Sequence, residues 1–471
     1  MREIMPFRYV EIKGLTSLPQ AGEIVRMTRH TAFDEHASFF HSDNQVLNDV
    51  WDLCKYSIKV TTFVGLYVDG DRERKPYEAD AYINQLSHYG VEDHYLTGRL
   101  THEHLLKYPT WPTEWRQHSV LMAWVDYLYS GCDESIRRHY DTLVGRLMLE
   151  RRRDDGLFMG SNAGPIRDII DWPAGERDGY DMEPLVKTVT SAFHAYSLEL
   201  MARIATALDK PEDARRFTEM QAETAAAIRA KLMDPERGIF IDGMDPESGK
   251  RSTHASLHAN MFPLAFGLVA PEDLATVAAF VRSRGMACSV YGAQYLLDGL
   301  YDAGEAQHAL DLLTATHDRS WAHWIYEVGS TITLEAWDRK YKGNLDWNHA
   351  WGAVPANTIP RKLMGIEPLE PGFARFRVRP QTASLGEATI RHPSPRGPID
   401  LKITRSGPAW QAILRVPADT VAEVHVPTEA IHRITISPNS PSSKPTFLRH
   451  EPGRSVFETP PGEWTFSVSQ L

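Results

Sequence analysis

Apolar residues recur every three or four positions along most of the chain, from about residue 42 to residue 360. This spacing places them on one face of a helix, so the pattern predicts a largely helical domain. The first helix is expected to begin at the capping-box pattern Ser42-Asp43-Asn44-Gln45. Further helices are expected over residues 117–130, 185–208, 212–233, 271–284, 289–303 and 304–316.

Long connections without helical periodicity separate these helices. They are expected at residues 65–80, 106–116, 153–183, 238–252 and 318–350. Inside one compact domain, loops of this length usually carry function. Many helices with functional loops gathered at one end favour an α/α toroid, although periodicity alone does not separate that fold from another helical bundle.

After Pro371 the pattern changes to an alternation of apolar and polar residues with period two. The expected strands cover residues 373–379, 388–391, 399–403, 411–416 and 464–468, separated by Pro, Gly and Ser. This pattern predicts an antiparallel β-sandwich that follows a mainly α domain. Residues 6–35, before the first helix, are also expected to be extended, with period-two alternation from Phe7 to Ile12.

The composition excludes some classes of protein. The chain of 471 residues is 42% hydrophobic and 24% charged, as in ordinary globular proteins. Its apolar stretches are too short to cross a membrane, and a net charge of −11 argues against nucleic acid as the main partner. The first residues lack an apolar signal core, and Cys54, Cys132 and Cys288 lack metal-ligand spacing. We therefore expect a cytoplasmic protein with free thiols.

Tryptophan is the unusual part of the composition. The chain has 12 Trp, and eight of them fall in expected loops or loop edges, at positions 111, 115, 172, 321, 324, 337, 347 and 351. A sugar-binding cleft needs aromatic side chains in such places, because their faces stack on the C–H faces of pyranose rings. Trp111 and Trp115 are expected at the rim of a cleft, with helix capping as the alternative.

The first candidate for chemistry is the loop Val68–Asp80. It holds the carboxylates Asp69, Asp71, Glu73, Glu78 and Asp80 together with three cationic side chains. A solvated charged loop looks similar, but the Gly, Pro and Tyr among these charges suit an ordered loop. Crowded carboxylates beside Arg and Lys push neighbouring pKa values apart, as acid–base catalysis requires.

The second candidate follows much later, in Thr331–Asp338, where Glu335 stands two residues before Trp337. Downstream, Asp346–Gly352 combines carboxylate, amide, imidazole and indole groups. Glycoside hydrolysis needs two carboxyl groups, and the two clusters together supply them. An ordinary helix edge with a buried Trp explains Glu335 and Trp337 equally well.

The order of these motifs resembles family 78 of the glycoside hydrolases, the α-L-rhamnosidases. That family carries Asp-Cys-Pro-Gln-Arg-Asp-Glu-Arg-Leu-Gly-Trp-Thr-Gly-Asp, and Asp69–Asp80 keeps its Glu-Arg pair and the Asp seven residues after the Glu. Thr331–Asp338 is similar to the family's Thr-Thr-Ile-Trp-Glu-Arg-Trp-Asp, with departures at Leu334 and Ala336. Asn348–Val354 is similar to Asn-His-Tyr-Ala-Phe-Gly-Ala-Val, and Gly365–Gln381 resembles the join to the family's C-terminal sandwich.

The resemblance implies an inverting exo-glycosidase that acts on terminal α-L-rhamnose or a close 6-deoxy analogue. It implies Glu73 as the general acid, Glu335 as the base that activates water, and Asp69 and Asp80 as ligands of the sugar hydroxyls. The other expected substrate-binding residues are Arg72, Asp171, Trp172, Trp324, Trp337 and His349. For Asp171 and Trp172 a plain turn is an alternative. No organic cofactor and no metal is implied.

The resemblance extends from Phe7 to the end of the chain and implies a six-hairpin α/α toroid. Because the family usually carries β-sandwich modules before the toroid, residues 1–35 are expected to be the remnant of such a module. The toroid is then expected over residues 36–365 and the sandwich over 366–471. The expected partner is a rhamnose-containing oligosaccharide or glycoside, without nucleic acid or membrane.

Two other functions stay open. Other α/α-toroid enzymes include glycosidases, phosphorylases and lyases, which the release of free sugar without phosphate would separate. The chain could also be a non-catalytic carbohydrate-binding relative. The presence of both Glu73 and Glu335 argues against that second alternative, because a binding protein needs no acid–base pair.

Overall fold

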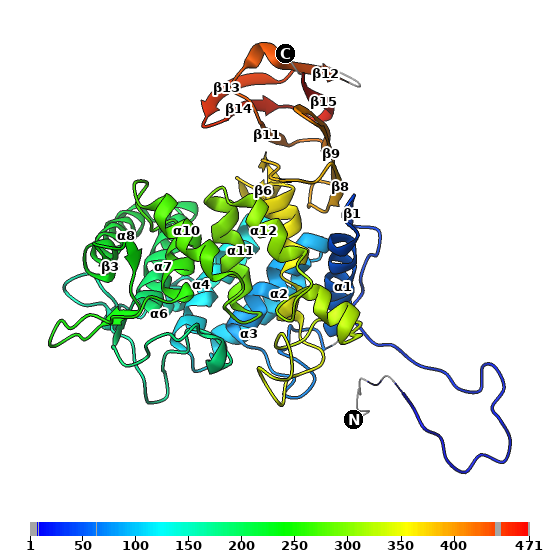
Figure 1. Ribbon diagram of the computed structural model, residues 1–471, viewed down its shortest axis with the longest axis horizontal. Helices are drawn as coiled ribbons and strands as arrows, with labels where there is room; N and C mark the ends of the chain where they lie inside the picture. Colours follow the sequence, from blue (N-terminus) through cyan, green and yellow to red (C-terminus); the bar gives the residue numbers. More distant parts are fainter. Residues whose placement is uncertain (1–6, 8, 63, 439–443, 470–471) are drawn as a thin grey trace.

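The computed structural model describes residues 7, 9–62, 64–438 and 444–469, in which a helical body carries a β-rich part (Figure 1). The longer helices of the body are α1 (Gln45–Thr61), α2 (Glu78–Val91), α3 (Leu96–Lys107), α4 (Thr113–Ser130), α7 (Thr188–Ala207), α8 (Pro211–Leu232), α9 (Leu257–Ala265), α10 (Leu274–Arg284), α11 (Gly292–Asp302) and α12 (Ala306–Leu313). The short helices are α5 (Glu134–Arg138), α6 (Tyr140–Arg146) and α13 (Pro355–Thr358). Within the described ranges, no helix has the length and apolar character needed to span a membrane.

Two kinds of helix alternate in the body. Every residue of α2 is buried, and α11 is buried up to its last residue, whereas α8 and α10 bury only one face. The buried helices α2, α4, α7, α9, α11 and α13 contact one another in that order. Helix α13 then contacts α2, so the buried helices close into a ring.

Hydrogen bonds between buried polar side chains join the helices of this ring. Ser87 Oγ of α2 donates to the carbonyl of Ala353 over 3.0 Å. Asn357 Nδ2 of α13 donates to Ser87 Oγ and, over 2.8 Å, to Gln294 Oε1 of α11. Buried polar groups are stable only when they are hydrogen-bonded. A helix that buries both polar and apolar faces has no amphipathic pattern, which explains why the sequence did not predict α2.

The sequence predicted some of the remaining helices and missed others. The six helices expected after residue 116 correspond to α4, α7, α8, α10, α11 and α12, with ends that differ by a few residues. Helices α3 and α9 were not expected. Helix α1 begins at Gln45, and its N-cap is Asn44, whose side chain accepts a hydrogen bond from the Leu47 N–H over 3.1 Å.

The β-rich part consists of two sheets that pack face to face. Its strands are β1 (Phe39–Ser42), β6 (Ile366–Pro368), β7 (Arg375–Val378), β8 (Glu387–His392), β9 (Ile399–Ser406), β10 (Ala409–Val416), β11 (Val421–Val426), β12 (Ile434–Pro438), β13 (Thr446–Glu451), β14 (Arg454–Thr459) and β15 (Gly462–Val468). The sheet orders are β1-β8-β9-β10-β15-β12 and β13-β14-β11-β7-β6. The rings of Phe457 and Phe466 meet between the sheets, with centroids 6.1 Å apart.

The sandwich departs from the prediction in one pair of strands. Strands β7 and β11 run parallel, whereas the other paired strands described in the two sheets are antiparallel. Two small two-stranded sheets lie within the helical body, formed by β2 (Val186–Lys187) with β5 (Gly243–Met244) and by β3 (Met233–Asp234) with β4 (Ile239–Phe240).

The segment before α1 contacts the sandwich through β1. No strand is assigned to residue 7 or to residues 9–38, so these residues pair with no sheet, and Arg8 lies outside the described residues. The extended conformation expected from Phe7 to Ile12 stays a prediction. The first strand of the described ranges is β1, which pairs with β8 and thereby ties the start of the helical body to the sandwich. The interpretation of residues 1–35 as a module remnant stays a prediction.

Candidate active site

A cavity of ≈ 180 Å³ in the helical body brings together residues from both chemical clusters of the sequence. Its lining residues are Asp69, Arg72, Glu73, Tyr77, Asp80, Trp111, Trp115, Ile169, Trp172, Glu335, His349 and Trp351. The lining thus combines carboxylates with indole rings.

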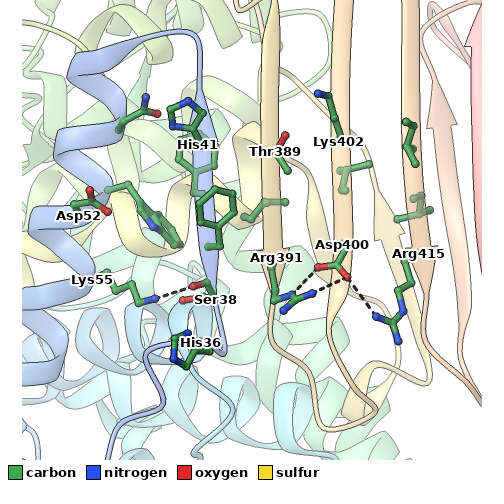
Figure 2. A pocket seen from close by; sticks show the side chains of 18 of the residues that line it. His36, Ser38, His41, Asp52, Lys55, Thr389, Arg391, Asp400, Lys402 and Arg415 are labelled. Atoms are coloured by element: carbon green, nitrogen blue, oxygen red, sulfur yellow. Dashed lines mark hydrogen bonds and ion pairs between the residues drawn. The ribbon is translucent and has the colours of Figure 1, made fainter.

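A larger cavity, of ≈ 760 Å³, lies between α1 and the sheet formed by β1, β8, β9 and β10 (Figure 2). There Asp400 is paired with Arg391 over 2.8 Å and lies 3.6 Å from Arg415. None of the residues predicted to act on substrate lines this cavity. The smaller cavity is therefore the candidate active site, despite the difference in volume.

Backbone hydrogen bonds hold the first charged loop against the second cluster. The N–H of Asp71 donates to Asn348 Oδ1 over 2.9 Å, and the N–H of Arg72 donates to Asp346 Oδ1 over 3.1 Å. Gly70 lies at the closest approach, where an added Cβ would clash with the Asp346 carboxylate and lie 2.9 Å from the carbonyl oxygen of Asn348. A glycine is needed there because the two loops touch.

The side chain of Arg72 lies between the two proposed catalytic carboxylates. Its Nη2 is 3.3 Å from Glu73 Oε1 and 3.5 Å from Glu335 Oε1. Because both oxygens lie this close to one atom, they are no more than about 7 Å apart. The Glu73 side chain is 42% exposed, whereas that of Glu335 is only 5% exposed. The cavity therefore has one open and one buried carboxylate.

Several protein groups fix the buried carboxylate of Glu335. Its Oε2 accepts the N–H of Asp346 over 2.7 Å, and its Oε1 lies 3.1 Å from Lys342 Nζ. The backbone carbonyl of Glu335 accepts the indole N–H of Trp351 over 3.1 Å. Glu335 is thus held through both side chain and backbone.

Asp69, Asp80 and His349 form a buried group beside these carboxylates. His349 Nε2 lies 2.6 Å from Asp80 Oδ1. Burial opposes the charged form of His349, but the hydrogen bond and the charge of Asp80 outweigh it and raise the pKa of His349. Burial and the nearby charge of Asp80 raise the pKa of Asp69 to about 6.

Glu335, Asp346 and His349 bring three possible metal-ligand atoms within 4.8 Å of one another. Positive groups already lie against this set, since Lys342 and Arg72 both contact Glu335. The donor set is therefore a poor fit for a cation. The absence of a metal requirement stays a prediction.

Three predicted site residues, Trp324, Trp337 and Asp171, do not line the cavity. Trp324 and Trp337 have no exposed surface, and their rings stack with centroids 5.3 Å apart. Trp324 Nε1 donates to the carbonyl of Trp337, and Trp337 Nε1 donates to that of Cys288. The prediction that these two Trp stack on the sugar is therefore wrong, because they are core residues.

Asp171 is also fully buried, and it lies 2.6 Å from His258 Nε2 and accepts the N–H of Ser289 over 3.0 Å. Its role is to hold neighbouring segments together, so the prediction of direct substrate contact is wrong. Its neighbour Trp172 does line the cavity, and so do the rim candidates Trp111 and Trp115.

Trp351, one of the loop Trp expected to suit a sugar-binding cleft, lines the cavity. The sequence did not single out Tyr77 or Ile169 as site residues. Tyr77 stands inside the charged loop, so its position carried a signal. Ile169 carries none, because a lone apolar residue in an irregular segment looks like any core residue.

The helical body places two carboxyl groups around an aromatic cavity, and a β-sandwich follows it in the chain. Glycoside hydrolysis needs such a pair of carboxyl groups. A family model described as the bacterial alpha-L-rhamnosidase 6 hairpin glycosidase domain matches residues 35–363. A second, described as the bacterial alpha-L-rhamnosidase C-terminal domain, matches residues 365–439. The chain therefore belongs to the bacterial α-L-rhamnosidase family of six-hairpin glycosidases.

Individual relatives agree with this family. An α-L-rhamnosidase of Alteromonas sp. (strain LOR) is 24% identical over 93% of this chain and 50% of its own length. The crystal structure of Streptomyces avermitilis α-L-rhamnosidase complexed with L-rhamnose matches 92% of this chain and 42% of its own, with 20% identity and a TM-score of 0.72. The structure of the α-L-rhamnosidase from Dictyoglumus thermophilum matches 94% of this chain and 51% of its own, with 17% identity and a TM-score of 0.76. At these identities the solved structures share the fold, and the chain spans about half of each relative.

Proposed function

We propose that the protein is an inverting exo-glycosidase that hydrolyses terminal α-L-rhamnosyl residues from oligosaccharides or glycosides. The observation that carries this proposal is the placement of Glu73 and Glu335 around one cavity, with Arg72 between them. Their Oε1 atoms lie at most about 7 Å apart, which allows both the lower end of the roughly 6.5–9.5 Å carboxyl separation of inverting enzymes and the roughly 5–5.5 Å of retaining ones. The inverting mechanism therefore rests on the resemblance to family 78.

The two carboxyl groups have different surroundings that suit different roles. Glu73, on the open side, would donate its proton to the glycosidic oxygen as the aglycone leaves. Glu335, on the buried side, would take a proton from a water that attacks the opposite face of the sugar. The water oxygen then bonds to the anomeric carbon while the bond to the aglycone breaks.

The rest of the lining suits a pyranose ring. Asp69, Asp80, Arg72 and His349 offer charged groups for the sugar hydroxyls, and Trp172 offers an indole face for ring stacking. Rhamnose as the sugar is supported by the family, and by the S. avermitilis relative, which was crystallised with L-rhamnose.

Glu73→Gln and Glu335→Gln should fail in different ways. An acid matters most for a poor leaving group, so Glu73→Gln should lose about 10²–10⁴-fold in kcat/KM on a rhamnosyl disaccharide and much less on 4-nitrophenyl α-L-rhamnoside. Glu335→Gln cannot activate water and should lose activity on both substrates alike.

Asp71→Asn is the matched control, because Asp71 is in the same loop but pairs with Arg74 and does not line the cavity. It should keep most of the activity. An equal loss for Glu73→Gln on both substrates would transfer the acid role to Asp69 or Asp80. NMR of the first product should show the anomer opposite to that of the substrate, and retention would contradict the inverting mechanism.

The alternative enzymes are separated by the product. A phosphorylase would need inorganic phosphate and release a sugar phosphate, whereas a lyase would leave an unsaturated sugar. Free rhamnose released in phosphate-free buffer supports hydrolysis. A carbohydrate-binding relative without activity would bind rhamnosides and release nothing.

We also propose that the closed ring of buried helices, with α8, α10 and α12 packed outside it, is an α/α toroid. The division into residues 36–365 and 366–471 is supported by the family models, which meet between residues 363 and 365. A cytoplasmic location is supported by the free thiols of Cys54, Cys132 and Cys288. Cell fractionation tests that location.

A further inference from the structure

Lys342 is a buried cation beside the proposed base. Its side chain is 7% exposed, its Nζ lies 3.1 Å from Glu335 Oε1, and it donates to Asn344 Oδ1 over 3.0 Å. A buried ammonium is costly unless a carboxylate compensates it. Among the ion pairs of the described residues, Glu335 is the only carboxylate that pairs with Lys342. The placement of Lys342 is therefore tied to Glu335.

The charged groups that face Glu335 come from several elements. Arg72 approaches from the loop before α2, Asp80 lies on α2, and Asp346 and His349 follow Lys342 in the chain. Asp69 and Glu73 complete the lining, so carboxylates outnumber cations around the cavity. A base in such surroundings needs a fixed positive charge to remain ionised.

Arg72 and Lys342 differ in what they can do for Glu335. Arg72 is shared, because it also contacts Glu73 and donates to the carbonyl of Asn344 over 2.6 Å. Lys342 contacts Glu335 at a shorter distance, and no second carboxylate of the described residues pairs with it. Both cations lie against Oε1, whereas the only donor to Oε2 in the described part of the chain is the Asp346 N–H. Oε2 is therefore the oxygen with room for another proton.

We propose that Lys342 is a positioning residue for Glu335: it holds Oε1 and keeps the carboxylate charged, so that Oε2 takes the proton of the attacking water. This inference rests on the proposed role of Glu335 as the base. The proton that leaves the water goes to Oε2, and the water oxygen bonds to the anomeric carbon, as in the proposed hydrolysis. Lys342 itself gives up no proton.

The test is the pH dependence of kcat/KM on 4-nitrophenyl α-L-rhamnoside. In Lys342→Met the acid limb should move to higher pH by about one unit or more, because an opposite charge this close shifts a carboxylate by that amount. At pH values well below the acid-limb midpoints of both proteins, this corresponds to a loss of about tenfold or more. The loss should appear in kcat rather than in KM, and Lys342→Arg should restore part of it.

Two further variants separate charge from structure. Lys342→Gln keeps a hydrogen-bond donor for Glu335 and Asn344 but no charge, so its acid limb should shift as in Lys342→Met. This variant decides the question if Lys342→Met fails to fold. Lys340→Met is the matched control, because Lys340 lies on the same loop, is 55% exposed and pairs with Asp318 instead. Its pH profile should equal that of the parent.

An unshifted acid limb in a folded Lys342→Met or Lys342→Gln would overturn the inference and leave Lys342 a loop anchor only. Glu335→Gln distinguishes this failure from that of the proposed function. If Glu335→Gln is inactive while the Lys342 variants keep the parental profile, only the inference about Lys342 fails. If Glu335→Gln stays active, Glu335 is not the base and both proposals fail.

Discussion

The hydroxyl of Tyr77 donates a hydrogen bond of 2.8 Å to Glu73 Oε2. Tyr77 is the N-cap residue of α2, and its ring packs edge-on against Trp115, with centroids 5.6 Å apart. The hydroxyl is therefore positioned by the helical body, whereas Glu73 lies on a loop and is partly exposed. The proposed acid takes its orientation from a rigid neighbour.

Tyr77→Phe should test this relationship. It removes the hydroxyl and keeps the ring, so the midpoint of thermal unfolding should change little. The hydrogen bond strengthens as Glu73 gives up its proton and becomes charged. Hydrogen bonds to charged groups are worth roughly 1.5–3 kcal/mol, so kcat/KM on a rhamnosyl disaccharide should fall about tenfold or more. The fall should be smaller on 4-nitrophenyl α-L-rhamnoside, whose leaving group needs less acid assistance. Equal losses on both substrates would contradict a role through Glu73.

Gly70→Ala should separate the two loops that form the site. The new Cβ would clash with the Asp346 carboxylate, so the loop carrying Arg72 and Glu73 must move away from Glu335. A displacement of about 1 Å costs on the order of 10²-fold in activity, and kcat/KM should fall by that factor. Gly343→Ala is the control, since a Cβ at Gly343 meets nothing within 4 Å. A parental kcat/KM for Gly70→Ala would show that the loops need no close contact.

The sequence singled out Glu73 and Glu335, the proposed catalytic pair, but not the way the two side chains are brought together. Glu73 and Glu335 stand in local motifs that short stretches of sequence can carry. Their meeting depends on the contact of Gly70 with the segment around Asp346, which is far away in sequence. It also depends on the ring of buried helices, in which α2 has no solvent-facing side and therefore no amphipathic signature.

The prediction of aromatic sugar contacts failed for a physical reason. An irregular segment that is buried leaves backbone carbonyls without partners, and the indole N–H groups of Trp324 and Trp337 satisfy two of them. Tryptophan outside periodic elements can therefore be a core residue that holds a loop. Position along the chain does not distinguish this role from that of Trp172, which is 37% exposed and lines the cavity.

Trp337→Ala and Trp172→Ala should therefore change different properties of the protein. Removing the buried ring of Trp337 should lower the free energy of unfolding by about 3–5 kcal/mol, measured by denaturant titration. Removing the partly exposed ring of Trp172 should change stability little and raise KM. Equal losses of stability in the two variants would mean that Trp172 also serves mainly to hold the fold.

Asp69 should make the free energy of unfolding depend on pH. Burial and the charge of Asp80 raise its pKa to about 6, above the value of about 3.9 in an unfolded chain. Between these two pH values the folded protein holds a proton that the unfolded chain has lost. The contribution of Asp69 to stability is therefore complete below about pH 4, falls as the pH rises to about 6, and stays low above that.

Asp69→Asn removes this cost, because an amide does not ionise and its Oδ1 can still accept the Lys75 N–H, which lies 2.9 Å from Asp69 Oδ1. The variant should be more stable than the parent by about 1–2 kcal/mol at pH 8 and equal to it near pH 3.5, while losing activity. Denaturant titrations at both pH values measure this difference. Asp71→Asn should show no such gain, since Asp71 is paired with Arg74 over 2.8 Å. If Asp69→Asn gained the same amount at both pH values, packing rather than charge would be the cause.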